Sequence, residues 1–173
     1  MGLKKNNDGI TLMELVISMA ITAIVFSMLI LIINTAAGSF KRTNENVNLQ
    51  LEAQITVNQL STILMEASKV TPGSAVEPDV KYLLSGSPNC YAIYFIKGEN
   101  RLYLISAGSI EEADGINPVL NEDTENQYLM AEYVKSFTIT MDGTTPTAKL
   151  TMEFELGDQT FTTSKNINLR NMK

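Results

Sequence analysis

The chain has 173 residues, a length that suits one domain with its own core plus an appendage better than two full domains. Its 13 Lys and Arg residues against 19 Asp and Glu residues give a net charge of −6, so general attraction to nucleic acid or to anionic lipid is not expected. Histidine is absent and Cys90 is the single cysteine, which excludes imidazole bases, Ser-His or Cys-His nucleophiles, an intrachain disulfide and a Cys/His zinc site. We therefore expect a protein that is not an enzyme and uses no cofactor. Cys90 is expected to be a half-buried residue ahead of a strand, and pairing with another chain remains open.

A continuous apolar segment follows a short polar stretch that contains two lysines. Residues 15–33 carry no charge, and their polar groups are Ser18, Thr22 and Ser27, whose hydroxyls can bond the carbonyls of the preceding turn. At about 1.5 Å per residue the segment reaches roughly 28 Å, close to the ~30 Å hydrocarbon thickness of a bilayer. The segment is longer than the apolar part of an ordinary secretory signal. We expect it to span a membrane, with the preceding lysines on the cytoplasmic side.

Glu14 is a charged residue at the start of this apolar segment. A lone carboxylate in lipid costs about 2.5–3.5 kcal/mol on insertion scales, so a charged group here is a functional candidate that needs a partner. The alternative is that Glu14 simply lies at the level of the lipid headgroups.

Residues 9–15, Gly-Ile-Thr-Leu-Met-Glu-Leu, resemble the type III signal of type IV pilins and pseudopilins, with isoleucine in place of the usual phenylalanine. In that family a membrane-embedded aspartyl prepilin peptidase cuts after the glycine and methylates the new N-terminus. The resemblance implies cleavage between Gly9 and Ile10 and N-methylation of Ile10. It also implies that Glu14 pairs with a backbone amine, commonly the N-terminal amine of a neighbouring subunit, so that neither charge stays uncompensated in an apolar filament core.

The resemblance also implies an α+β fold, the pilin fold, in which a long N-terminal helix packs on an antiparallel β-sheet head. Residues 1–9 would be a leader peptide, residues 10–33 the membrane-spanning and polymerising half of the helix, and residues 34–173 the extracytoplasmic head. Many major pilins have a proline inside this helix. Residues 10–70 contain none, which favours a minor pilin or pseudopilin.

An amphipathic pattern continues the helix over residues 34–70. On a helical wheel one broad apolar stripe should face the sheet, while polar residues such as Ser61 take other directions. The stripe consists of Leu49, Ala53, Val57, Leu60, Ile63, Leu64, Ala67 and Val70. Val47, Leu51 and Ile55 lie outside the stripe, where they would suit contact with a neighbouring subunit or be ordinary exposed apolar residues.

Pro72 and Gly73 are predicted to end the helix, because the residue before a proline avoids helical geometry. Residues 73–90 are rich in Pro, Gly, Ser and Asn and are predicted to be a connecting loop with little regular structure. Residues 91–96 and 101–106 then predict a β-hairpin.

Strand patterns return from Tyr128 onward. Residues 134–141, 148–156 and 159–169 are predicted strands, so the expected sheet covers residues 91–169. The succession ends in Leu-Arg-Asn at 169–171, which is similar to the end of minor pilins of the W and J type.

Acidic residues are concentrated over residues 111–132, and no Lys or Arg occurs between Arg101 and Lys135. We interpret this segment as a solvated acidic loop. Calcium binding is the alternative, because hard oxygen ligands are plentiful, although the segment from Asp114 to Asn117 lacks the full pattern of a calcium loop.

The leading functional hypothesis is a structural subunit of a type IV pilus-like filament. Its partners would be other pilin subunits, the prepilin peptidase, and a membrane assembly platform with its ATPase; direct nucleic-acid binding is not expected. The protein would cross the cytoplasmic membrane once with its N-terminus inside, and lie on the cell surface after assembly. The alternative is a single-pass, membrane-anchored extracytoplasmic binding or receptor domain with an uncleaved signal anchor. The sequence leaves open whether the filament serves adhesion, motility, DNA uptake or secretion.

Overall fold

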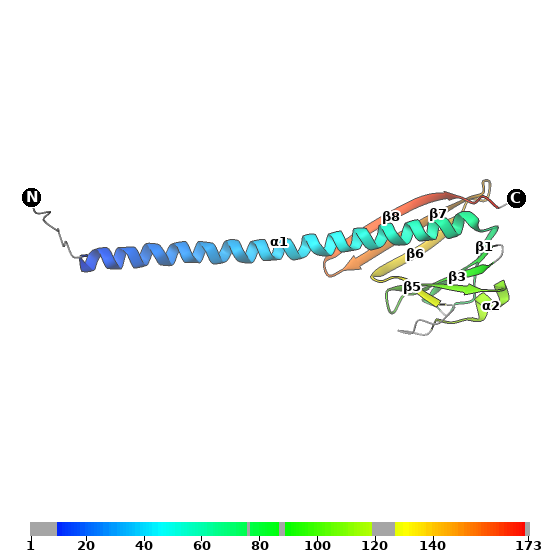
Figure 1. Cartoon of the computed structure of the whole chain (residues 1–173), viewed down its shortest axis with the longest axis horizontal. Helices are drawn as coiled ribbons and strands as arrows, with labels where there is room; N and C mark the ends of the chain where they lie inside the picture. Colours follow the sequence, from blue (N-terminus) through cyan, green and yellow to red (C-terminus); the bar gives the residue numbers. More distant parts are fainter. Residues whose placement is uncertain (1–9, 76, 87–88, 119–126, 172–173) are drawn as a thin grey trace, which may run out of the picture. The chain divides into compact units, whose positions relative to one another are not determined.

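The computed structural model describes residues 10–75, 77–86, 89–118 and 127–171. The fold is α+β, with a long N-terminal helix packed on antiparallel sheets, as expected (Figure 1). The chain divides into two compact units, Met1–Thr43 and Asn44–Lys173, and helix α1 contributes to both. The elements in chain order are α1 (Leu12–Glu66), β1 (Lys69–Pro72), β2 (Val80–Ser85), β3 (Cys90–Ile96), β4 (Arg101–Ala107), α2 (Ile110–Gly115), β5 (Gln127–Ala131), β6 (Val134–Met141), β7 (Thr147–Leu156) and β8 (Gln159–Asn168).

The described part of the first unit is the start of α1, and all of its residues are exposed. The hydroxyls expected to bond back to the helix do so. Ser18 donates to the carbonyl of Glu14, Thr22 to that of Ser18, and Ser27 to that of Ala23, each at 2.7 Å. These polar side chains therefore make their hydrogen bonds within the helix, and its surface stays apolar.

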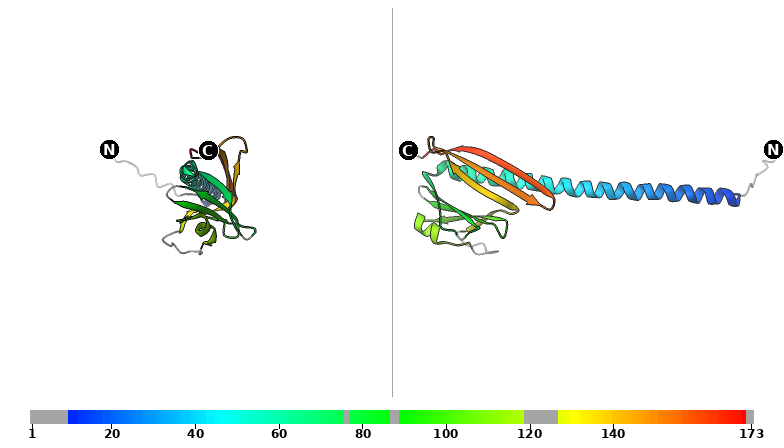
Figure 2. Two further views of the ribbon diagram at one scale, coloured as in Figure 1. Left: turned by 90° about the vertical axis from the view of Figure 1, so that its right-hand side faces the viewer. Right: turned by 180° about the vertical axis from the view of Figure 1, so that it is seen from behind.

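The second unit, which we call the head, contains two antiparallel sheets instead of the single sheet expected. One has five strands in the order β1-β2-β3-β4-β5, and the other has three in the order β6-β7-β8. Both are meanders, because each strand pairs with the next one along the chain. Figure 2 shows them as separate sheets beside the part of α1 that belongs to the head.

The main core of the head lies where α1 meets both sheets. Leu49, Ala53 and Leu60 of α1 are at most 1% exposed, as the helical spacing of the apolar stripe predicts. They belong to one buried cluster with residues of both sheets. Phe137 of β6 joins the sheets directly, because its ring lies 5.6 Å from that of Tyr82 and 6.5 Å from that of Phe95.

A second, smaller cluster lies on the other face of the five-stranded sheet, under α2. It contains Leu83, Ala92, Tyr94, Ile105, Ala107 and Ala113. Both faces of β3 are therefore buried, which explains why its sequence reads as a nearly continuous apolar run.

Lys81 of β2 is buried beside this cluster and is only 2% exposed. Its Nζ donates to the carbonyls of Asp114 at 2.7 Å and Ile116 at 3.1 Å, and lies 3.9 Å from the Asp114 carboxylate and 5.0 Å from the centre of the Tyr94 ring. Burial lowers the pKa of Lys81 below its ordinary value, and the Asp114 carboxylate offsets part of that shift. The lysine thus fixes the end of α2 against the sheet.

The predicted end of the helix is wrong. α1 ends at Glu66, and residues 69–72, which include the predicted helix stop at Pro72, form β1 instead. The cause is long-range pairing: β1 aligns with β2, and Ser68 N–H donates to the carbonyl of Ser85 at 2.7 Å. Strand β2 in turn lies inside the segment predicted to be an irregular loop, so that prediction is also wrong.

The segment after β8 completes the helix end. Arg170 N–H donates to the carbonyl of Met65 at 3.0 Å, and the Asn171 side chain donates from Nδ2 to that of Glu66 at 2.8 Å. Leu169 beside them is 3% exposed. The Leu-Arg-Asn sequence therefore anchors one apolar residue and satisfies two carbonyls that a helix end leaves unpaired.

The predicted hairpin and later strands are confirmed. β3 pairs with β4, and β6, β7 and β8 fall within one residue of the predicted ranges. Ser61, which was assigned to the polar side, is 1% exposed and donates to the carbonyl of Val57. Cys90 is half-buried and begins β3.

Candidate functional site

The first turn of α1 holds the sequence-predicted assembly residue Glu14. Thr11 precedes the helix, and its N–H and Oγ1 each donate to Glu14 Oε2 at 3.1 Å. The Glu14 N–H donates in return to Thr11 Oγ1 at 3.3 Å. This reciprocal pair is a capping box, which satisfies N–H groups that a helix start leaves unpaired.

Glu14 has its other carboxylate oxygen available. Within the part of the chain that the structure describes, Oε1 of Glu14 has no hydrogen-bond partner and no cation pairs with the side chain. The positive end of the helix dipole favours an anion at this position. The carboxylate is therefore held by one oxygen and can receive a donor from another molecule with the second.

Ile10, the residue predicted to become the N-terminus, lies immediately before the cap. Its side chain is 76% exposed. Gly9, the other residue of the predicted cleavage site, lies outside the described residues. The Gly9–Ile10 bond therefore stays a sequence prediction.

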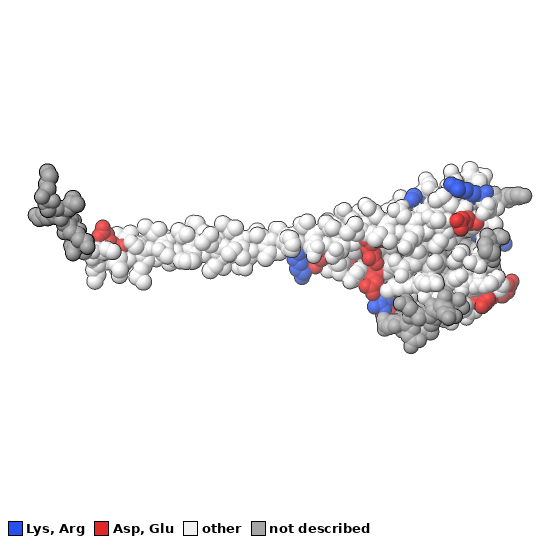
Figure 3. Space-filling model, in the orientation of Figure 1, with Lys and Arg blue, Asp and Glu red and all other residues white. Residues whose placement is uncertain are grey.

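The apolar surface of α1 begins at this turn. An 18-residue window of the helix has a mean hydropathy of 2.8 and is 0% buried, so by length and composition the helix is able to cross a membrane. Residues 15–40 carry no charge, and at about 1.5 Å per residue they span roughly 39 Å. Figure 3 shows this uncharged stretch between an acidic side chain at its start and basic ones at its end. The run exceeds a ~30 Å bilayer core, so Glu14 and Lys41 can both lie at headgroup level in a single tilted subunit.

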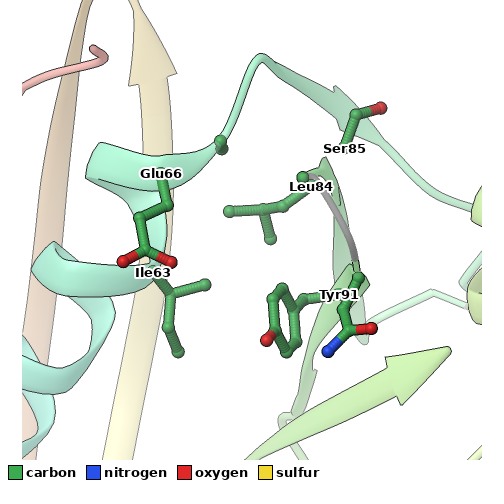
Figure 4. A pocket seen from close by; sticks show the side chains of 8 residues that line it. Ile63, Glu66, Leu84, Ser85 and Tyr91 are labelled. Atoms are coloured by element: carbon green, nitrogen blue, oxygen red, sulfur yellow. The ribbon is translucent and has the colours of Figure 1, made fainter. Parts of the chain in front are cut away.

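A small, partly open cavity lies in the head at the end of α1 (Figure 4). Its volume is about 30 Å³, and Ile63, Glu66, Leu84, Ser85 and Tyr91 are among the residues that line it. A space of this size accommodates about one or two water molecules. It does not suit a substrate or cofactor.

A second hollow is an open groove of about 550 Å³ between α1 and the edge strand β5. Its walls include Gln59 and Thr62 of α1 and Leu129 of β5, and none of its lining residues is charged. Two hydrogen bonds hold α1 beside this strand: Thr56 Oγ1 donates to the carbonyl of Met130 at 3.3 Å, and Glu132 N–H donates to Glu52 Oε1 at 2.8 Å.

The described parts of the acidic segment include regular structure in place of the expected loop. Its first residues form α2, where Ser109 caps the helix by accepting from the N–H of Glu112. The Asp114 carboxylate already has hydrogen-bond partners within the chain: it accepts from the N–H of Ser74 at 2.6 Å and from the Ser74 hydroxyl at 2.9 Å. The Ser74 N–H is the main cause of a lowered pKa for Asp114. Among the described residues no cluster of three His, Cys, Asp or Glu side chains is placed to hold a metal; residues 119–126 of the segment lie outside them.

The prokaryotic N-terminal methylation motif matches residues 4–30. This motif is the type IV prepilin signal, and the matched range includes Gly9, Ile10 and Glu14. No curated protein and no solved structure shows significant similarity to the chain. The signal supports a type IV pilin-like protein, and the helix-on-sheet architecture matches the pilin fold. In general, such a signal implies processing by a prepilin peptidase and assembly with other pilin subunits.

Sequence reasoning identified Glu14 but missed its partner Thr11. The signal was present, because Thr-x-x-Glu directly before an apolar run is the sequence signature of a capping box. It also missed the role of Asn171. That contact joins positions far apart in the chain, which no local pattern reveals.

Proposed function

We propose that this chain is a structural subunit, a minor pilin or pseudopilin, of a type IV pilus-like filament, with no catalytic role of its own. The observation that carries the proposal is the first turn of α1. There an oriented carboxylate stands at the start of a helix whose apolar residues find no partner within their own unit. A water-soluble protein would bury such a surface, so its partners are lipid first and other subunits later.

The capping box gives the carboxylate a defined role in assembly. Thr11 holds Oε2 of Glu14, and Oε1 remains for the N-terminal amine of Ile10 in a neighbouring subunit. The amine exists only after cleavage between Gly9 and Ile10. Pairing compensates both charges as they enter an apolar filament core, where an unpaired charge is strongly unfavourable.

Repeated head-to-tail contacts of this kind produce an open helical array. An inner-membrane platform and its ATPase would supply the force for assembly. Before assembly the subunit would cross the cytoplasmic membrane once, with residues 1–9 inside and the head outside. The absence of proline from residues 10–70 and the Leu-Arg-Asn sequence support a minor pilin or pseudopilin over a major pilin.

The decisive measurement is the mass of the protein after co-expression with an active prepilin peptidase. We expect residues 1–9 to be removed and one methyl group to be added at Ile10. A catalytically inactive peptidase is the control and should leave the mass unchanged. An intact chain beside another prepilin that the same peptidase processes would contradict the proposal.

The open groove between α1 and β5 favours one second candidate, a membrane-anchored binding domain. Its volume of about 550 Å³ falls in the range of small-molecule sites, and the groove is open to solvent. This function predicts an uncleaved N-terminus and gives the oriented carboxylate of Glu14 no purpose. The same mass measurement therefore separates the two candidates.

A further inference from the structure

Strand β8 forms one margin of the three-stranded sheet and is long for an edge strand (Figure 2). It has 10 residues, whereas the other edge strands in the described part of the head, β1, β5 and β6, have 4, 5 and 8. It pairs with β7 alone, and the register runs from Gln159 to Asn168 without a shift. The opposite edge of β8 is therefore long and regular.

The free edge of β8 presents the backbone groups of its even-numbered residues. Just beyond the strand, Leu169 N–H donates to the carbonyl of Pro146 at 2.8 Å and continues the register with β7. In an antiparallel pair alternate residues bond to the partner strand, so the odd-numbered residues bond to β7 and the even-numbered ones turn their N–H and C=O groups away from it. Within the part of the chain that the structure describes, no other group bonds to these N–H and C=O groups. The even-numbered residues are all exposed and uncharged: Thr160, Thr162, Ser164, Asn166 and Asn168.

The other edge strands carry features that oppose pairing. Strand β1 ends at Pro72, which has no N–H, and β6 begins with a register shift between Val134 and Ser136. The edge of β5 is held by its two hydrogen bonds to α1. Native proteins use proline, bulges and covered edges in this way to prevent strand addition. In β8 the one charged side chain, Lys165, reaches α1, where its Nζ donates to Asn58 Oδ1 at 3.4 Å.

The direction of β8 argues against a second copy of β8 as the added strand. A Cβ atom placed on Gly157, in the turn before β8, would lie 3.5 Å from Glu45 Oε1, and after the strand Asn171 contacts Glu66. Strand β8 therefore runs beside the head part of α1 in the same direction. A two-fold antiparallel pair of β8 strands would direct the two α1 helices oppositely, which does not suit two subunits anchored in one membrane.

We propose that the free edge of β8 accepts an extended segment of a different protein of the same filament, added as an antiparallel fourth strand. The inference rests on the proposed function and adds the kind of partner that one edge of the head receives. Backbone hydrogen bonds would provide the affinity, and alternate side chains the specificity. Phe161 faces the core side and is partly buried there, so apolar residues of the donor suit that side, while polar residues suit the side of the exposed hydroxyls and amides.

Hydrogen exchange tests the added strand residue by residue. In the processed full chain in detergent, we expect the odd-numbered amides of β8 to be protected by β7 and the even-numbered ones to exchange fast. In purified filaments, exchanged and then dissolved for mass spectrometry, exchange of the even-numbered amides should be slowed about tenfold or more. Even-numbered amides that exchange equally fast in both states, or that are already protected in detergent, would overturn the inference.

Proline substitutions test the same edge by removing its donors. Thr162→Pro and Ser164→Pro remove N–H groups that point away from β7, so the β7–β8 hydrogen bonds remain. They should leave removal of residues 1–9 unchanged and lower incorporation into filaments about tenfold, the effect of roughly 1.4 kcal/mol. The matched controls Thr162→Val and Ser164→Val keep the N–H groups and should incorporate normally. Equal incorporation of the proline and valine variants would show that no strand is added.

A photo-reactive benzoylphenylalanine in place of Thr162 identifies the occupant in purified filaments. We expect an adduct with a different filament protein, and the cross-linked peptide locates the added segment. The same group in place of Thr138, on the same sheet face but on β6, is the control and should not give that adduct. Adducts made solely of two copies of this chain would overturn the assignment of the partner. Failure of the unsubstituted chain to be processed or incorporated would instead reject the proposed function, whereas normal incorporation with an uncovered β8 edge would reject this inference alone.

Discussion

Helix α1 has two stretches that differ in the burial of their apolar side chains: the first lies within residues 10–43, and the second belongs to the head. In residues 10–43 every side chain is exposed, and Leu31, for example, is 67% exposed. In the head the apolar stripe of the same helix is buried against two sheets, and Leu60 is 0% exposed. The second stretch thus has its partner inside the chain, whereas the first requires one from outside.

Removing the first stretch should have the largest effect. A chain that begins at Asn34 loses residues 15–33 of the uncharged run but keeps the whole buried cluster, so we expect a soluble monomer. Light scattering after gel filtration, with membrane fractionation of the full chain as the control, measures this. A truncated chain that remains in membranes or aggregates would show that the head is not independent of the first stretch.

The next largest effect should follow from removing the charge of Glu14. Glu14→Ala should leave membrane insertion intact or improved, because a carboxylate near lipid is unfavourable, while lowering assembly by about tenfold or more. Glu14→Gln separates charge from cap, since its amide oxygen still accepts from Thr11. If pairing with the amine is required, Glu14→Ala and Glu14→Gln should reduce assembly to the same extent. Assembly is measured as the amount of subunit recovered in sheared filaments. Normal incorporation of Glu14→Gln would refute the pairing.

Thr11 offers the matched comparison at the same turn. Thr11→Val removes the hydroxyl of the capping box and should cost the helix start about 1 kcal/mol. We therefore expect a smaller assembly defect than for Glu14→Ala. An equal or larger defect would mean that orientation of the carboxylate matters more than its charge.

The two stretches also differ in how well the sequence predicted them. Local periodicity correctly predicted three features: the apolar run, the stripe through Leu49 and Leu60, and the later strands. In each case burial in lipid or in the core of the head requires apolar residues at regular spacing. The end of α1 and strand β2 do not, because pairing of Lys69–Pro72 with β2 overrides the local helix pattern and the Pro/Gly content that predicted a loop. At the candidate site, the motif was sufficient to identify Glu14. Its orientation by Thr11 required the geometry of the first turn.

Within the head, burial should separate two leucines of the same helix. Leu60→Ala leaves a cavity in the core and should lower the free energy of unfolding by about 3 kcal/mol. Leu51 is 52% exposed, so Leu51→Ala should lower the free energy of unfolding by less than about 0.5 kcal/mol. Urea unfolding of the chain that begins at Asn34 measures both. Similar costs would mean that Leu51 is covered within the head.

The buried Lys81 makes a polar contact whose contribution to the stability of the head should be similar in size to that of Leu60. Lys81→Met keeps most of the volume but leaves the carbonyls of Asp114 and Ile116 without their donor, so we expect a loss of about 2 kcal/mol in the free energy of unfolding. The control is Lys97→Met, at an exposed lysine, which should change stability by less than about 0.5 kcal/mol. If the Lys81→Met variant were as stable as the unsubstituted head, water would be replacing the lysine as the donor to these carbonyls. The position of α2 would then not depend on Lys81.

The smallest effect should come from the segment that closes the helix end. Asn171→Ala removes the donor to the carbonyl of Glu66 and should cost about 1 kcal/mol in urea unfolding. Asn171→Asp keeps the shape but places an anion at the negative end of the helix dipole, so it should be more destabilising than alanine. The reverse order would mean that the side-chain amide does not act as a cap. Because neither variant touches residues 10–43, removal of residues 1–9 should proceed normally in both, which keeps the stability of the head separate from the chemistry of its anchor.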